Sequence, residues 1–188
     1  MSQTKLRFLG NFCLLIGVAG LIFTFYPIIR EELSYRFGQP QLLTAPDSGY
    51  SITIPSIRVS APVIAGVDPF NRSEYIKALQ QGIAQAQGTA LPGQAGTQYL
   101  FAHSSDAPWR LSRYNTAFFR LNQVKPGDQI LVRYRGNLYT YQVTGQKTVW
   151  PNDLSYLKDT AKNQLILQTC TPIGTDWKRL LVFAEPVS

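Results

Sequence analysis

The sequence predicts an all-β domain, either a barrel or a sandwich, that follows a hydrophobic N-terminal helix. Short apolar or alternating runs recur from residue 51 to the C-terminus, and turns that contain Gly or Pro separate them. Only residues 73–81 have the pattern of a helix longer than a turn within this region. With 45% apolar and 15% charged residues, the 188-residue chain has a globular composition and is long enough for one domain with an appendage.

Residues 8–29 form an uncharged hydrophobic segment, and Lys5 and Arg7 precede it. At about 1.5 Å per residue, a helix of this length spans a bilayer core of roughly 30 Å. The positive-inside rule then places the N-terminus in the cytoplasm and the domain outside. A cleaved signal peptide is the alternative, but the segment is longer than a usual signal core and no small-x-small site follows it. We therefore expect an uncleaved transmembrane anchor over residues 1–30, in a single-pass protein of the cell membrane with an extracytoplasmic domain.

Residues 31–49 are expected to form a linker, and the folded domain is expected at residues 50–188. The linker contains two Gly and two Pro residues, which disfavour regular structure. Residues 51–59 then alternate between apolar and polar types, which is typical of a strand, with Pro55 at an edge or a bulge. Another short strand is predicted at residues 61–65.

The one predicted helix, at residues 73–81, has plausible signals at both ends. Ser73 can cap its first turn and Gly82 can end it. The strand predicted at residues 98–103 then brings His103 to its C-terminal end. Beyond it, the sequence predicts a polar loop at residues 104–115, a helical turn at 116–124, a tight turn at 125–128, a hairpin of residues 129–134 and 138–149, and a further helical turn at 153–157.

Two apolar runs, residues 165–167 and 180–183, predict the strands that close the domain. Cys170 lies where the first of them enters a loop, and Arg179 lies where the second begins. If the two strands pair, the thiol and the guanidinium can face one site.

The formal net charge of +7 could indicate a nucleic-acid-binding protein. The basic residues, however, are scattered from Arg30 to Arg179 and form no dense run. A solvated basic surface near an anionic envelope explains this pattern better, so we expect no nucleic-acid partner.

Three residues of the domain could together perform acyl transfer. Cys13 lies in the hydrophobic segment, so Cys170 is the one cysteine of the domain and a candidate reactive thiol. His103 is the only histidine of the chain, and Arg179 closely follows Cys170. A thiolate can attack a carbonyl, an imidazole can take the thiol proton and give it to a leaving amine, and a guanidinium can stabilise negative charge on the carbonyl oxygen.

Each of these residues also has an ordinary structural explanation. Taken alone, Cys170 fits a small buried hydrophobic residue, Arg179 a surface charge, and His103 a structural histidine at a strand end. One Cys and one His are too few for a structural zinc site, so we predict no metal. Asp106 and Asp176 are expected to cap or solvate turns, and orientation of the site is their less favoured role.

The segments around Cys170 and His103 carry recognisable motifs. Ile166-Leu-Gln-Thr-Cys170-Thr-Pro-Ile-Gly174 leads to Arg179-Leu-Leu-Val, and Phe101-Ala102 precedes His103. These segments resemble the motifs of the sortases, which are membrane-anchored cysteine transpeptidases of bacterial surfaces. The sortase signature reads Thr-Leu-x-Thr-Cys, then usually Thr-Pro-x-Gly, and then Arg before a Leu-Val strand, while the family's histidine usually follows Ala-Gly. Ile166 and Ala102 depart from these patterns.

The resemblance implies a closed eight-stranded β-barrel with short helices. It implies Cys170 as nucleophile, His103 as general acid and base, Arg179 as the stabiliser of the oxyanion or substrate, and Thr169 as a substrate contact. The substrates would be secreted surface proteins with a C-terminal sorting motif similar to Leu-Pro-x-Thr-Gly. Cys170 would form a thioester with them, and an amine of a cell-wall peptide or a pilin lysine would accept the acyl group. This chemistry needs no cofactor, and no carboxylate cluster for calcium is recognisable.

Two other functions stay open at this point. A sortase-like hydrolase would pass the thioester to water, and sequence does not separate it from a transpeptidase. A membrane-anchored, non-catalytic β-domain that binds envelope components would have an unreactive Cys170 and would lose no function in Cys170→Ala. The joint presence of Cys170, His103 and Arg179 in matching motifs favours an enzyme.

Overall fold

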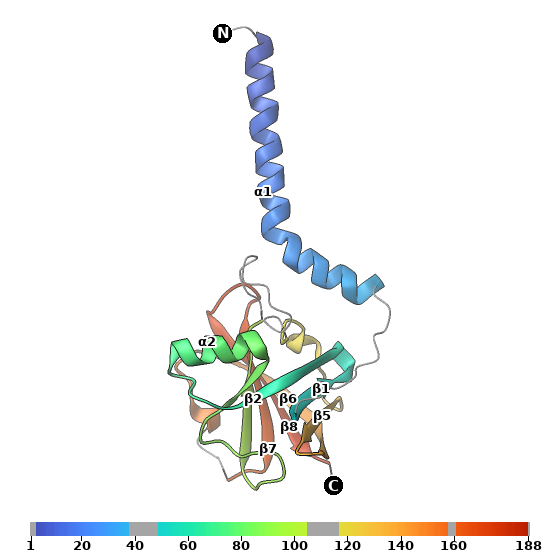
Figure 1. Cartoon of the computed structure of the whole chain (residues 1–188), viewed down its shortest axis with the longest axis vertical. Helices are drawn as coiled ribbons and strands as arrows, with labels where there is room; N and C mark the ends of the chain where they lie inside the picture. The colour runs from blue at the N-terminus through green and yellow to red at the C-terminus, as the bar shows by residue number, and fades with distance from the viewer. Residues whose placement is uncertain (1–2, 38–48, 105–116, 158–160, 188) are drawn as a thin grey trace. The chain divides into compact units, whose positions relative to one another are not determined.

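The computed structural model describes residues 3–37, 49–104, 117–157 and 161–187 (Figure 1). The chain divides into two compact units, Met1–Leu42 and Leu43–Ser188. The first unit contains helix α1, and the second contains every strand that the structure describes.

Helix α1 (Gln3–Phe37) is a continuous helix of 35 residues. Many of its large apolar side chains are exposed rather than packed into a core. Over the described part of the chain, no helix has both the length and the apolar character that a membrane crossing requires. The transmembrane anchor over residues 1–30 therefore stays a prediction. The exposed side chains include Phe8, Phe12, Leu14, Leu15, Ile16, Leu21, Ile22 and Phe23.

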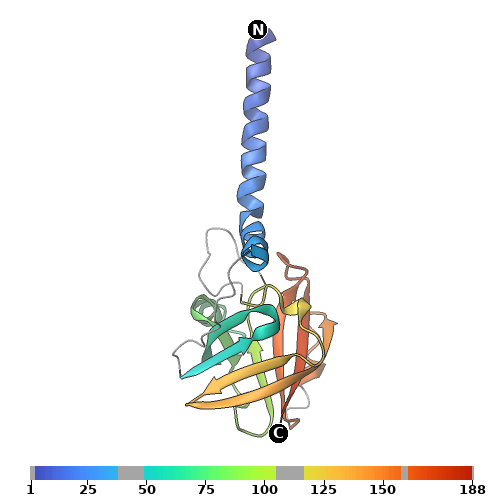
Figure 2. The same cartoon turned by 90° about the vertical axis from the view of Figure 1, so that its right-hand side faces the viewer.

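The second unit is a closed barrel, and its described strands follow the spatial order β1-β2-β3-β4-β7-β8-β6-β5 (Figure 1, Figure 2). Neighbouring strands are antiparallel except for the parallel pairs β2–β3 and β4–β7. The eight-stranded barrel that the resemblance implied is thus confirmed. Its strands are β1 (Tyr50–Ile54), β2 (Val59–Val67), β3 (Ile83–Ala86), β4 (Thr97–Phe101), β5 (Gln129–Tyr134), β6 (Asn137–Val149), β7 (Gln164–Thr171) and β8 (Lys178–Pro186).

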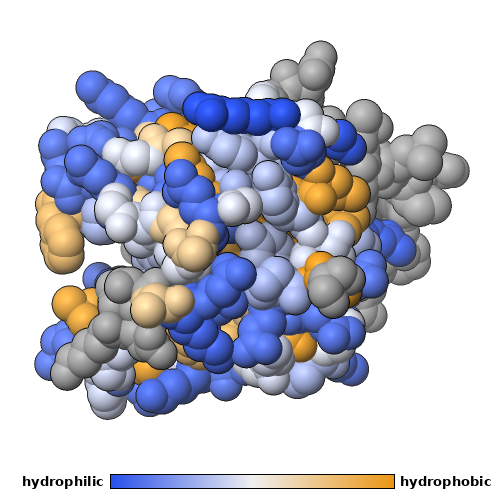
Figure 3. Space-filling model, turned by 90° about the horizontal axis from the view of Figure 1, so that it is seen from below, coloured by the Kyte–Doolittle hydropathy of each residue, from blue (hydrophilic) through white to orange (hydrophobic). Residues whose placement is uncertain are grey.

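The core of this unit is formed by apolar side chains from all around the barrel. On the face seen in Figure 3, hydrophobic residues lie in small groups among hydrophilic ones, as expected when the large apolar side chains are inside. Side chains that are fully buried include Ile52, Ile83, Leu100, Ile130, Leu165, Leu167 and Val182.

A buried polar cluster, called here the inner cluster, consists of Gln98, Tyr50 and Tyr141. Nε2 of Gln98 donates to the hydroxyl of Tyr50, and its Oε1 accepts a hydrogen bond of 3.1 Å from the hydroxyl of Tyr141. Burial raises the pKa of both tyrosines, so both hydroxyls stay protonated. The two ends of the Gln98 amide are therefore both used within the protein.

The single strand predicted at residues 51–59 is wrong, because Pro55 divides it. β1 ends at Ile54, the 3-10 turn η1 (Pro55–Ile57) follows, and β2 begins at Val59. Proline has no N–H to donate to a strand neighbour, and its φ suits the first position of a turn. Arg58 completes the reversal in a left-handed conformation with φ of 54°. The strand predicted at residues 61–65 is the middle of β2.

Helix α2 (Arg72–Gln81) confirms the predicted helix but not its predicted cap. Its N-cap is Asn71, whose side-chain oxygen accepts from the backbone N–H of Glu74 at 3.4 Å, so Ser73 lies inside the first turn. Gly82 ends the helix as predicted, and a Cβ there would lie 2.3 Å from the backbone oxygen of Pro62. The four-residue strand β3 follows directly and was not predicted.

The predicted hairpin is confirmed by the antiparallel pairing of β5 with β6. Its two turn residues are Arg135 and Gly136, with φ of 49° and 83°. The tight turn before it is closed by a hydrogen bond of 3.0 Å from the N–H of Asp128 to the oxygen of Lys125. The predicted helical turns correspond to the 3-10 turns η3 (Leu121–Gln123) and η4 (Ser155–Leu157). The loop predicted at residues 104–115 lies outside the described residues except for Ser104.

Candidate active site

Cys170 and Arg179 lie opposite each other on neighbouring antiparallel strands. They are Cα partners in the register of β7 and β8. Side chains of directly opposite residues project from the same face of a sheet, with Cβ atoms about 4.5–5.5 Å apart. Both side chains are partly buried. The structure therefore brings the predicted thiol and guanidinium to one site at the end of β7.

His103 follows β4 by two residues and reaches the same end of the barrel. β4 and β7 are parallel, with Phe101 opposite Gln168. The N–H of Ala102 donates to the oxygen of Gln168 at 3.1 Å, which continues this pairing one residue beyond the strand. Continuing this parallel pairing, His103 lies level with Cys170. The three residues expected to share a site thus come from the ends of three adjacent strands.

Thr169 is buried, with 3% of its surface exposed, on the face of β7 opposite to Cys170. Its hydroxyl donates a hydrogen bond of 2.9 Å to the backbone oxygen of Ala102. This bond ties β7 to the segment that carries His103, next to Cys170. The predicted contact between Thr169 and the substrate stays a prediction.

The local environment makes the Cys170 thiol less acidic than an ordinary one. Burial raises its pKa most, the charge of Arg179 lowers it, and the carboxylate of Asp176 raises it. At neutral pH the thiol is therefore mainly protonated. A nearby base is needed to generate the thiolate, and the imidazole of His103 is the group whose ordinary pKa suits that role.

The guanidinium of Arg179 is held by the loop between β7 and β8 and by the first residue of β8. Its Nη1 donates to the backbone oxygens of Asp176 at 2.8 Å and Lys178 at 3.3 Å. Among the described residues, none accepts a hydrogen bond from Nε or Nη2. One side of the guanidinium is thus anchored, and the other donors can bind an oxygen atom of a ligand.

Sequence reasoning missed three polar residues beside this site. Gln168 lies on the same face of β7 as Cys170, and the hydroxyls of Tyr99 and Tyr156 donate to its side-chain oxygen. Because side chains two residues apart on a strand share a face, the position of Cys170 could have indicated Gln168. Nothing in the sequence indicated the tyrosines, which lie 69 (Tyr99) and 12 (Tyr156) residues from Gln168 along the chain.

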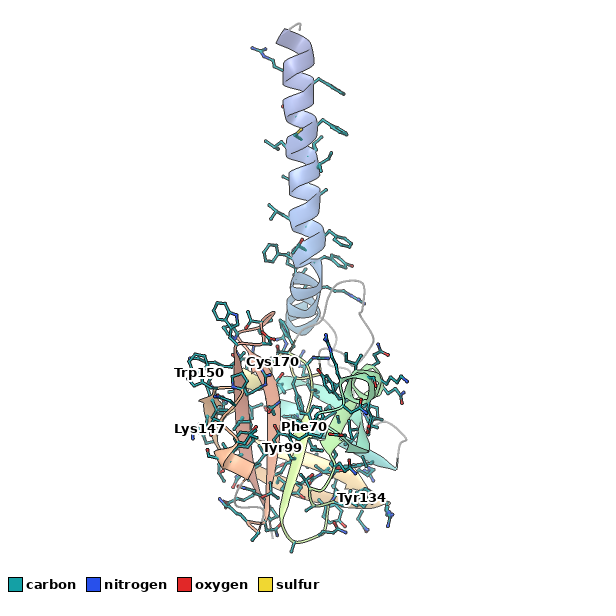
Figure 4. All side chains as sticks on the ribbon, turned by 90° about the vertical axis from the view of Figure 1, so that its left-hand side faces the viewer. Phe70, Tyr99, Tyr134, Lys147, Trp150 and Cys170 are labelled. Carbon is teal, nitrogen blue, oxygen red and sulfur yellow. The ribbon has the colours of Figure 1, made fainter. Side chains whose placement is uncertain are left out.

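Two aromatic side chains are exposed near the same end of the barrel. Trp150 and Trp177 are 61% and 69% exposed, and the ammonium of Lys178 lies 4.8 Å from the centre of the Trp150 ring. Figure 4 shows Trp150 and Cys170 toward the same end of the barrel. Over the described ranges, no group of three or more His, Cys, Asp or Glu side chains could hold a metal ion. Asp106 lies outside those ranges.

A family model described as the Sortase domain matches residues 52–187 of the chain. Sortase A of Bacillus anthracis is 28% identical over 136 residues, which cover 72% of this chain. The chain spans 58% of the length of that relative, which is less than two thirds.

Solved sortase structures resemble the barrel. Sortase A from Corynebacterium diphtheriae, as a lid mutant, has a TM-score of 0.62 at 32% identity, covering 74% of this chain and 69% of that one. Sortase C2 of Pilus Island 1 from Group B Streptococcus has a TM-score of 0.63 at 30% identity, covering 78% of this chain and 77% of that one.

Proposed function

The chain belongs to the sortase family, whose members are cysteine transpeptidases, and we propose that it cleaves a C-terminal sorting motif of surface proteins and transfers them to an amine. The observation that carries this proposal is the convergence of Cys170, Arg179 and His103 at the ends of β7, β8 and β4. The proposed motif is similar to Leu-Pro-x-Thr-Gly, with the Thr carbonyl as the point of attack.

In the first proposed step, His103 takes the proton of the Cys170 thiol and the thiolate attacks the Thr carbonyl carbon. A carbon–sulfur bond forms, and the carbonyl oxygen becomes an oxyanion that the guanidinium of Arg179 stabilises. The peptide carbon–nitrogen bond then breaks, and His103 returns the proton to the leaving amine. The raised pKa of Cys170 supports this assignment, because a protonated thiol requires a base.

In the second proposed step, an acceptor amine attacks the thioester. A carbon–nitrogen bond forms, the carbon–sulfur bond breaks, and the amine's proton passes through His103 to the departing thiolate. The acceptor is an amine of a cell-wall peptide or a pilin lysine. If water takes the place of the amine, the same site acts as a hydrolase, which is the second candidate function.

The proposal also places the barrel outside the cell at the membrane surface. Three observations support it: the uncharged run over residues 8–29, the exposed apolar side chains of α1, and the basic residues Lys5 and Arg7 before that run. In this arrangement the barrel meets secreted proteins as they leave the membrane.

Mass spectrometry of the full chain in detergent tests the proposal. The chain is incubated with a pooled library of peptides similar to Leu-Pro-x-Thr-Gly and with several amines, alongside Cys170→Ala. We expect an acyl-enzyme on Cys170 and a new amide product, both absent in the variant. Cleavage without an amide would favour the hydrolase. No acyl-enzyme and no cleavage with any peptide would favour a non-catalytic domain that binds envelope components.

A further inference from the structure

Next to the candidate nucleophile lies the group of polar side chains called here the outer cluster: Gln168 on β7, Tyr99 on β4 and Tyr156 in η4. Both tyrosine hydroxyls donate to Oε1 of Gln168, that of Tyr156 over 3.2 Å. The two hydroxyl oxygens are 3.3 Å apart, and the rings stack with their centroids 6.0 Å apart. Tyrosines from two other elements therefore hold the amide group of Gln168.

The two donated bonds determine how the Gln168 amide is oriented. Because Oε1 accepts both, Nε2 and its two N–H groups are turned away from the tyrosines. Within the described ranges, no residue accepts a hydrogen bond from this Nε2. Gln168 is only partly buried, so a ligand on this face can reach the group.

The hydrogen bond from Tyr99 holds this orientation over a wide pH range. Burial is the main reason that the pKa of Tyr99 is raised, and its neighbour Tyr156 raises it further. The hydroxyl of Tyr99 therefore stays protonated and continues to donate its hydrogen bond to Gln168. The ring of Phe101 packs against that of Tyr99 with centroids 6.2 Å apart, which limits the motion of the Tyr99 ring.

Gln168 and Cys170 project from the same face of β7, because side chains two residues apart on a strand point the same way. Their Cα atoms are separated by about 6.6 Å, twice the rise of a strand residue. An extended peptide has the same repeat. When such a peptide runs alongside β7 with one carbonyl carbon at Cys170, the carbonyl two residues away lies level with Gln168.

We propose that Gln168 is a substrate-binding residue, whose Nε2 donates a hydrogen bond to a main-chain carbonyl of the peptide two residues from the carbonyl that Cys170 attacks. Tyr99 and Tyr156 act through Gln168 and are positioning residues. The inference rests on the proposed function, since it requires a peptide substrate at Cys170. It adds a contact that recognises the extended backbone beside the reacting bond.

The test combines a variant of the protein with variants of the peptide. Peptides are made in which one main-chain carbonyl at a time is a thioamide, whose sulfur is a weaker hydrogen-bond acceptor than oxygen. KM and kcat for acyl-enzyme formation are measured with the full chain in detergent, as wild type, Gln168→Met and Gln142→Met. Gln142 is a matched control, because it is exposed on β6 and its amide donates to the oxygen of Gly127.

In the wild type and in Gln142→Met, we expect one thioamide position, two residues from the attacked carbonyl, to raise KM about five- to tenfold, the scale of one lost hydrogen bond. In Gln168→Met, KM for the unmodified peptide rises by the same factor and the thioamide has no further effect. The same thioamide penalty in Gln168→Met would overturn the inference while leaving the proposed function intact. A wild type that forms no acyl-enzyme with any peptide would overturn both.

The double variant Tyr99→Phe with Tyr156→Phe tests the same idea with Gln168 in place, and it decides the matter if Gln168→Met does not fold. Both rings stay, but the hydroxyls that orient the amide are gone. We expect a higher KM, little change in kcat, and a smaller thioamide penalty at the same position. If the tyrosines served stability alone, the melting temperature would fall but the thioamide penalty would be unchanged, and the inference would be wrong.

Discussion

The barrel contains two clusters of one glutamine and two tyrosines, and they differ in how the amide is used. In the inner cluster, Gln98 donates from Nε2 to one tyrosine and accepts at Oε1 from the other. In the outer cluster, Oε1 of Gln168 accepts from both tyrosines, and Nε2 has no acceptor among the described residues. Gln98 is on β4 and Gln168 is on the adjacent β7.

This difference separates a stabilising cluster from one suited to binding. Inside the barrel an unused N–H would carry the full penalty of desolvation, so both ends of the Gln98 amide have partners. On the partly exposed face beside Cys170 water can solvate an unused N–H until a ligand replaces it. Substitutions of residues inside the barrel should therefore mainly lower stability, and substitutions on the outer face beside Cys170 should mainly lower activity.

The largest effect is expected on the outer side. Arg179→Ala should lower kcat/KM by about a hundredfold or more, because the charge proposed to stabilise the oxyanion is lost. Arg179→Lys should restore little, since an ammonium does not reproduce the donor geometry of the guanidinium. The measurement is single-turnover acylation with a cleaved peptide. Full activity in Arg179→Ala would remove this residue from the mechanism.

On the inner side, Gln98→Met should lower the free energy of unfolding by about 2–3 kcal/mol, because the hydroxyl of Tyr141 loses its acceptor and that of Tyr50 loses one partner. Gln168→Met is the matched comparison and should lower it by less, because the hydroxyls of Tyr99 and Tyr156 lie 3.3 Å apart and can still bond to each other. Urea unfolding followed by tyrosine and tryptophan fluorescence gives both values. Equal losses would contradict the distinction between the two clusters.

The reactivity of Cys170 should respond to charge on the outer side only. Asp176 raises the pKa of Cys170 and Arg179 lowers it, so Asp176→Asn should move thiol alkylation to lower pH and Arg179→Ala should move it to higher pH. Iodoacetamide labelling in a Cys13→Ser background measures both changes. Gln98→Met should leave the alkylation profile in place. Shifts in the same direction for the two charge variants would contradict the assignment.

The smallest effect is expected for Thr169→Val. Thr169 is on the buried face of β7, and its hydroxyl bonds to the segment that carries His103. The change removes the hydrogen bond to the oxygen of Ala102 while keeping the shape of the side chain, so stability should fall by about 1 kcal/mol. Because this bond positions the segment that carries His103, kcat should fall as well. Unfolding and kcat measured on one preparation test both. Loss of stability with unchanged kcat would limit Thr169 to a structural role.

Much of the barrel followed from patterns that are local in the chain. The hairpin at Arg135 and Gly136, the helix ended by Gly82 and the two closing strands were predicted because their signals lie within a few residues. The pairing of Cys170 with Arg179 is also local, since one short loop joins their strands. The interruption at Pro55 was underestimated because the alternation continued past it.

Other features depended on contacts between distant segments. β3 is too short to give a periodic signal, and its strand pairing with β2 and β4 defines it. Asn71 was missed as the helix cap because Ser73 is also a good capping residue, and only the backbone geometry distinguishes them. The outer cluster required the parallel pairing of β4 with β7, which brings Tyr99 to Gln168.

Residue types and their spacing were enough to propose the chemistry, because a thiol, an imidazole and a guanidinium have intrinsic properties that no fold creates. The folded barrel decided where those groups meet and how burial and charge shift the pKa of the thiol. It also decided which end of each glutamine amide is used. Such features arise from register, alternation and burial across strands, and these are properties of the closed sheet rather than of any one segment.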